Sequence, residues 1–173
     1  MLKAPQVANH LPAFSSVFPE ARFVVNVRDP YRVFASGRAM VGGIVDGFIT
    51  DDFQPPDPLP VENLERVLQS ILDFHAAAPE LTTTVDYPAL VADPAAVAAA
   101  TYAGLGLPVD PDLASNVDAF LEAQRNGARV RPPAVLPEPG LTHDQMLQRP
   151  TVAAFCARFG VEPERVRLTG AHG

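Results

Sequence analysis

The chain has 173 residues, of which 47% are apolar and 19% charged, a composition typical of one globular domain. Its net charge of −7 argues against a general nucleic-acid binder, because neutralising phosphates needs clustered lysine and arginine. A single cysteine excludes an intramolecular disulfide and a cysteine-based zinc site, and no apolar run approaches the roughly 20 residues of a membrane span.

The amino-terminal part of the chain predicts a helix, a buried strand and a second helix. Its first residues contain no signal-peptide core, so we expect a cytoplasmic protein. Apolar residues recur at helical spacing over residues 9–18. The β-branched and aromatic run 22–27 predicts a buried strand. An Asp-Pro pair then starts a helix over residues 29–41, which we expect a Gly-Gly pair to end.

The rest of the chain continues the alternation of helices and strands. A strand is expected over residues 82–86, an acidic, proline-rich loop over 51–60, and an irregular basic and proline-rich segment over 125–141. Apolar periodicity and helix-start residues predict helices over residues 64–75, 94–104, 110–124 and 150–159. The alternation favours an α/β fold with a parallel sheet, although a parallel sheet buried on both faces normally needs more strands than the two or three visible here.

The segment from Arg28 to Ser36 is the clearest candidate for a binding site. Arg28 follows a predicted strand, and Ser36 lies eight residues on, about two turns into the next helix. Open α/β folds bind ligands at the carboxyl edge of the sheet, where a helix N-terminus presents free amides. An arginine can grip a phosphate through two hydrogen bonds, and a serine can donate another. The alternative is a structural ion pair between Arg28 and Asp29 beside an ordinary helical serine.

This spacing and its flanking residues resemble the bacterial branch of the sulfotransferases that use 3'-phosphoadenosine-5'-phosphosulfate (PAPS). The likeness covers Leu-Lys-Ala-Pro at 2–5, Val-Phe-Pro-Glu-Ala-Arg-Phe at 17–23 and Arg-Asp-Pro at 28–30. The resemblance implies that Arg28 and Ser36 bind the 3'-phosphate of PAPS.

The same resemblance implies roles for three further residues. A Tyr-x-x-Leu-x-x-Asp-Pro segment at 87–94 is similar to one lining the family's adenine pocket, which gives Tyr87 a base-stacking role. Lys3 stands where the family has a lysine near the bridging oxygen between phosphate and sulfonate, and a fixed cation there stabilises the leaving phosphate. Arg125 is loosely similar to a basic loop that closes on the 3'-phosphate. The alternatives are a tyrosine packed over the sheet end, a solvated terminal lysine and a solvated basic loop.

Two departures from the family pattern bear on activity. The Gly- and Ser/Thr-rich loop that cradles the 5'-phosphosulfate has no counterpart in the sequence. Where relatives carry a histidine near the lysine, this chain has Pro5 or Val7, so His10 is the nearest candidate general base, or else a helix-start histidine bound to backbone or solvent. His75 is expected to be a satisfied core histidine, and His143 belongs to no recognisable constellation.

These observations leave two main functions open. The first is a sulfotransferase that moves sulfonate from PAPS to a hydroxyl or amine of a small-molecule acceptor without a metal, on a P-loop-like three-layer α/β sandwich with a parallel sheet. The second is a non-catalytic relative that binds PAP-like nucleotides or needs a partner to complete its fold. On either hypothesis, residues 1–173 form a single partial, N-terminally truncated domain, as a possible homo-oligomer or beside a completing polypeptide. A remnant that binds no ligand is a third alternative.

Overall fold

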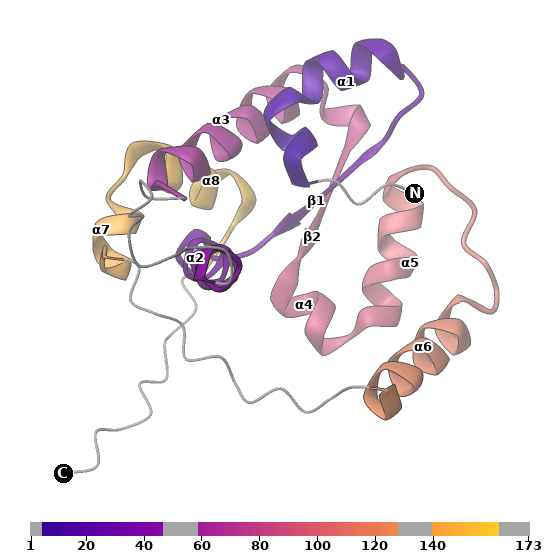
Figure 1. Cartoon of the computed structure of the whole chain (residues 1–173). Coiled ribbons are helices and arrows are strands. Elements are labelled where there is room, and N and C mark those ends of the chain that lie inside the picture. Colours follow the sequence, from indigo (N-terminus) through magenta and orange to yellow (C-terminus); the bar gives the residue numbers. More distant parts are fainter. Residues whose placement is uncertain (1–4, 47–58, 128–139, 163–173) are drawn as a thin grey trace.

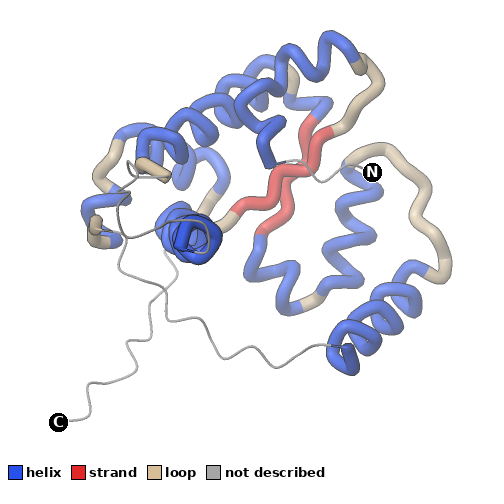
Figure 2. Tube along the Cα trace, in the orientation of Figure 1, coloured by secondary structure: helices blue, strands red, loops and turns tan. Residues whose placement is uncertain are grey.

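Two parallel strands lie at the centre of the structure, with helices on both sides (Figures 1 and 2). The computed structural model describes residues 5–46, 59–127 and 140–162. Strand β1 (Phe23–Val27) pairs in parallel with β2 (Thr82–Asp86), and the last residues of the two strands lie opposite each other. Both carboxyl ends therefore meet at one edge of the sheet. Both predicted strands are confirmed, and the described part of the chain is a mixed helix and strand structure around a small parallel sheet.

All six predicted helices are present: those over residues 94–104 and 150–159 have the predicted bounds, and the other four have altered bounds. In chain order, the helices are η1 (Pro5–His10, a 3-10 helix), α1 (Leu11–Val17), α2 (Pro30–Asp46), α3 (Val61–Ala77), η2 (Pro79–Leu81, also 3-10), α4 (Tyr87–Ala92), α5 (Pro94–Gly104), α6 (Leu113–Gly127), α7 (His143–Leu147) and α8 (Pro150–Phe159). None of these described helices is both long and apolar enough to cross a membrane.

Three differences from the sequence predictions have local causes. Helix α2 continues through the Gly-Gly pair, because each glycine costs a helix only about 1 kcal/mol and does not by itself end it. Helix α6 extends to Gly127, so the start of the predicted irregular segment is helical, while residues 128–139 lie outside the described ranges. Helices α4 and α7 were not predicted, because both are too short to show apolar periodicity.

Most of the buried side chains gather on one side of the sheet, where the carboxyl end of β1 meets four helices. The core cluster comes from β1, α2, α3, α7 and α8 and consists of Val27, Phe34, Leu68, Met146, Val152 and Phe155. Aromatic packing continues it toward the other end of β1, where Phe23 meets Phe74 of α3 edge-on at a ring-centroid distance of 5.0 Å. Helices α1 and α3 thus cover one face of the sheet.

Helix α5 covers the opposite face beside β2 (Figure 1). It approaches the strand closely, because its last residue, Gly104, has no side chain. A Cβ atom at Gly104 would lie 3.1 Å from the Thr83 hydroxyl oxygen, which is tighter than ordinary packing. On the same face, Val24 of β1 is 49% exposed.

Candidate functional site

Each strand leads into a helix that begins at an aspartate. Asp29 caps α2, because its Oδ1 accepts the Tyr31 backbone N–H at 2.9 Å. Asp86, the last residue of β2, caps α4 in the same way by accepting the Ala89 N–H at 3.0 Å. The two caps fix the turns that follow β1 and β2 at the carboxyl edge of the sheet. Open α/β folds bind their ligands at this edge.

Arg28 and Tyr87 meet at this edge. The guanidinium carbon of Arg28 lies 4.1 Å from the centroid of the Tyr87 ring, close enough for a cation–π interaction. Both residues are partly exposed, so a ligand can approach them. The fold therefore brings together two residues that the sequence assigned to the phosphate and the base of one nucleotide. Since Arg28 comes from the end of β1 and Tyr87 from the end of β2, only the parallel pairing of the strands makes this contact possible.

The other predicted nucleotide ligands are more dispersed. Ser36 lies on the solvent-exposed side of α2, on the same face as Val33 and Met40. Arg125 is exposed in the last turn of α6, so it belongs to a helix rather than to the loop that was predicted. Lys3 lies outside the described residues. The nucleotide-binding roles of Ser36 and Arg125 and the catalytic role of Lys3 stay predictions.

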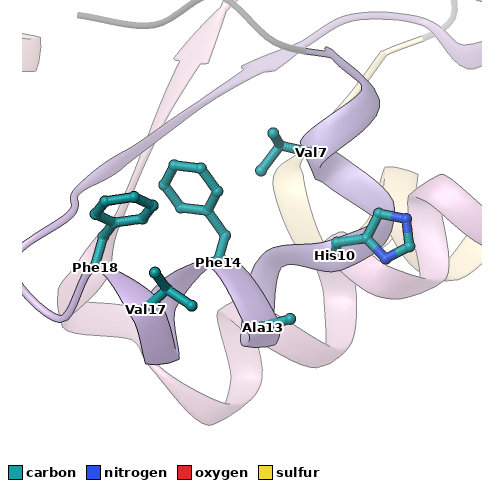
Figure 3. Close-up of a pocket in the computed structure, with 6 residues that line it drawn as sticks. All are labelled: Val7, His10, Ala13, Phe14, Val17 and Phe18. Carbon is teal, nitrogen blue, oxygen red and sulfur yellow. The ribbon is translucent and has the colours of Figure 1, made fainter.

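An open apolar groove of about 400 Å³ lies along η1 and α1 (Figure 3). Figure 3 shows His10 at one end of the groove and Phe18 at the other. The groove belongs to the amino end of β1, because its lining residue Phe14 packs 6.0 Å from Phe23, the first residue of that strand. Five strand residues, roughly 15 Å, separate that end from Arg28. The groove is therefore not the pocket of the Arg28–Tyr87 pair, and the role of the exposed His10 as a general base stays a prediction.

His75 is a satisfied structural histidine, as the sequence predicted. Its Nδ1 lies 2.6 Å from the Thr82 hydroxyl, and its Nε2 lies 2.9 Å from an Arg158 guanidinium nitrogen. Because a guanidinium can only donate, Nε2 is the acceptor and Nδ1 carries the proton. Burial, and then the positive charge of Arg158, lower the pKa of His75. This histidine thus joins α3 to β2 and α8 and contributes no reactive group to the sheet edge.

Comparison with known proteins decides the family. A model of the sulfotransferase family matches residues 1–111, which is most of the chain. The chain belongs to the sulfotransferase family. No curated protein and no solved structure matches the chain significantly.

The matched part of the chain contains both strands and the Arg28–Tyr87 contact. Arg125 and helices α7 and α8 follow it in the sequence. Among the described residues, no group of three or more histidine, cysteine, aspartate or glutamate side chains is arranged to hold a metal ion.

The sequence did not predict one contact near this edge of the sheet. His143 was assigned to no constellation, yet its Nε2 lies 2.9 Å from Oδ2 of Asp29, whose side chain is 1% exposed. The Nε2 atom is buried and its alignment falls short of a good hydrogen bond, so we describe the contact as a close polar contact. A sequence signal existed for the helix that carries His143, because Thr142 and Gln145 have the Thr-x-x-Gln spacing of a capping box. No sequence signal pointed to its partner on α2.

Proposed function

We propose that this chain carries the nucleotide-binding part of a sulfotransferase that transfers sulfonate from PAPS to a hydroxyl or amine of a small-molecule acceptor. In this proposal Arg28, with Ser36, holds the 3'-phosphate, and Tyr87 faces the adenine. The observation that supports it is the contact of Arg28 with Tyr87 at the carboxyl ends of adjacent parallel strands. The two strands would belong to a larger parallel sheet in a P-loop-like three-layer sandwich, and helices on both faces of the present sheet agree with that arrangement.

The chemistry of the pair suits a nucleotide with an extra phosphate on its ribose. The Tyr87 ring restrains the guanidinium of Arg28 from one side, while the rim of a guanidinium carries five N–H donors. Two of these can bond a terminal phosphate, and such charge-assisted bonds are about twice as strong as neutral ones. An aromatic ring nearby offers a face on which a base can stack. PAPS and its product, adenosine 3',5'-bisphosphate, both combine an adenine base with a 3'-phosphate.

The transfer step needs a base for the acceptor proton and a cation for the leaving phosphate. We assign these roles to His10 and Lys3, following the resemblance of the amino-terminal segment. An acceptor hydroxyl or amine loses its proton to His10 as its oxygen or nitrogen bonds to sulfur. The bond between sulfur and the bridging oxygen breaks, and Lys3 stabilises the charge that develops on that phosphate. Arg125 is assigned to closure over the 3'-phosphate.

A second candidate is a relative that binds the nucleotide without transferring sulfonate. The half-exposed Val24 on β1 favours it, since a strand side chain of this kind is normally covered in a complete parallel sheet. In this candidate, a second copy of the chain or another polypeptide would complete the sheet.

Calorimetric binding of adenosine 3',5'-bisphosphate and adenosine 5'-monophosphate tests the nucleotide site. A site built on Arg28 should bind the bisphosphate about tenfold or more tightly than the monophosphate. This ratio of dissociation constants corresponds to the free energy of one hydrogen bond to a charged group. Equal affinities, or no binding of either nucleotide, would refute the proposal. Incubation with PAPS labelled in its sulfonate group and a panel of phenols, alcohols and amines then separates the two candidates. Labelled product identifies a transferase, whereas tight bisphosphate binding without product supports the non-catalytic relative.

A further inference from the structure

Asp29 lies at the junction of the sheet edge with the carboxyl-terminal helices. Its side chain is 1% exposed, so its charge needs partners within the protein. One carboxylate oxygen, Oδ1, is used to cap α2 through the Tyr31 N–H. The other, Oδ2, lies 2.9 Å from Nε2 of His143. The residue next to Asp29 in the sequence is Arg28, so whatever fixes this carboxylate also restrains the turn that carries the guanidinium.

His143 is held firmly on its own side of the contact. It is the first residue of α7, which begins with the Thr142–Gln145 capping box. Met146 in the same helix is fully buried and belongs to the core cluster that also contains Val27, the last residue of β1. The His143 ring also lies 5.0 Å from the Tyr31 ring, at an interplanar angle of 55°. Helix α7 thus presents the imidazole to Asp29 from a fixed position.

We propose that His143 is a positioning residue for the phosphate-binding turn of this sulfotransferase. By pairing with Asp29 it fixes the start of α2, and thereby holds Arg28 against Tyr87 in the geometry that grips a 3'-phosphate. The inference rests on the proposed nucleotide site. It adds that a helix beyond the family match at residues 1–111 sets the site's discrimination between nucleotides with and without the 3'-phosphate.

A purely structural role for His143 would lower stability without changing this discrimination. Arg149 offers a matched control, because it also ties the carboxyl-terminal helices to the rest of the protein. Its guanidinium reaches Glu65 at 2.5 Å and Glu62 at 3.4 Å, and both carboxylates belong to α3. Replacing Arg149 therefore loosens the same region without touching the turn at Arg28.

The experiment measures dissociation constants for adenosine 3',5'-bisphosphate and adenosine 5'-monophosphate with the full chain. The variants are His143→Ala, His143→Gln and Arg149→Ala. The ratio is the dissociation constant of the 5'-monophosphate divided by that of the bisphosphate. In His143→Ala this ratio should fall by about tenfold, since a misplaced arginine loses a charge-assisted bond to the phosphate. In His143→Gln the ratio should fall less, because the glutamine amide offers an N–H donor to Asp29. Arg149→Ala should keep the ratio of the natural protein, even if its melting temperature drops.

The inference is overturned if His143→Ala keeps the full ratio, or if Arg149→Ala loses as much of it. If His143→Ala does not fold, the ratio measured with His143→Gln decides instead, together with the ratio of a further variant, Asp29→Asn. The inference is overturned when both of these variants keep the ratio of the natural protein. Any of these results that overturns the inference leaves the proposed function standing, as long as the natural protein prefers the bisphosphate. Absence of any preference in the natural protein would instead remove the proposed function, and this inference with it.

Discussion

Two methionines in very different surroundings allow a direct test of how the carboxyl-terminal helices are attached. Met146 of α7 is 0% exposed and packs in the core with Val27 and Phe34, whereas Met40 of α2 is 64% exposed. Met146→Ala removes a fully buried side chain and leaves a cavity, which should cost about 2–5 kcal/mol of unfolding free energy. Met40→Ala makes the same chemical change at the surface and should cost no more than about 0.5 kcal/mol.

Urea unfolding followed by circular dichroism measures both changes. The expected result is a clearly lower midpoint for Met146→Ala with an unchanged slope, and a midpoint near that of the natural protein for Met40→Ala. A loss below about 1 kcal/mol for Met146→Ala would show that α7 does not share a core with β1 and α2. The contact of His143 with Asp29 would then lose its structural support.

Three further predictions test the packing around the site. Gly104→Ala should lower the unfolding free energy measured in urea by about 1 kcal/mol or more, because the added Cβ would press on the Thr83 hydroxyl. The loss should be smaller in a Thr83→Ala background, and equal losses in both backgrounds would contradict this explanation. Burial, and then the negative charge of Asp29, raise the pKa of the Cys156 thiol. An aromatic disulfide reagent should therefore label Cys156 more slowly in the folded protein than in urea. Equal labelling rates would refute the assignment. Because the pKa of His75 is lowered in the folded protein, the unfolded chain binds a proton more readily. The contribution of His75 to stability is therefore complete above about pH 6.5 and is lost as the pH falls. His75→Gln should flatten this dependence of the unfolding free energy on pH, and an unaltered dependence would contradict the assignment.

Local sequence signals predicted the elements that form the site. The β-branched run of β1 and the Asp-Pro start of α2 are short-range features, and both appear where they were expected. The paired strands then explain why Arg28 and Tyr87, which are far apart in the sequence, come into contact. The resemblance had assigned both residues to one nucleotide, although nothing in the sequence indicated that they touch.

Tertiary contacts were the part that the sequence could not provide. The pairing of His143 with Asp29 depends on how α7 docks against α2, and that docking is decided by buried side chains such as Met146. No periodicity within a five-residue helix predicts its partner. Helix α2 shows the limit of local rules in another way, because it continues past the Gly-Gly pair that was expected to end it.

Nucleotide binding by an Arg28→Ala variant tests the central claim most directly. Arg22→Ala is the matched control, since Arg22 precedes the amino end of β1 and bonds only backbone carbonyls at Glu20 and Ala21 in the described contacts. Arg28→Ala should lose the preference for adenosine 3',5'-bisphosphate while its weaker affinity for the 5'-monophosphate stays the same, and Arg22→Ala should change neither. Retention of the full preference by Arg28→Ala would show that another group holds the 3'-phosphate.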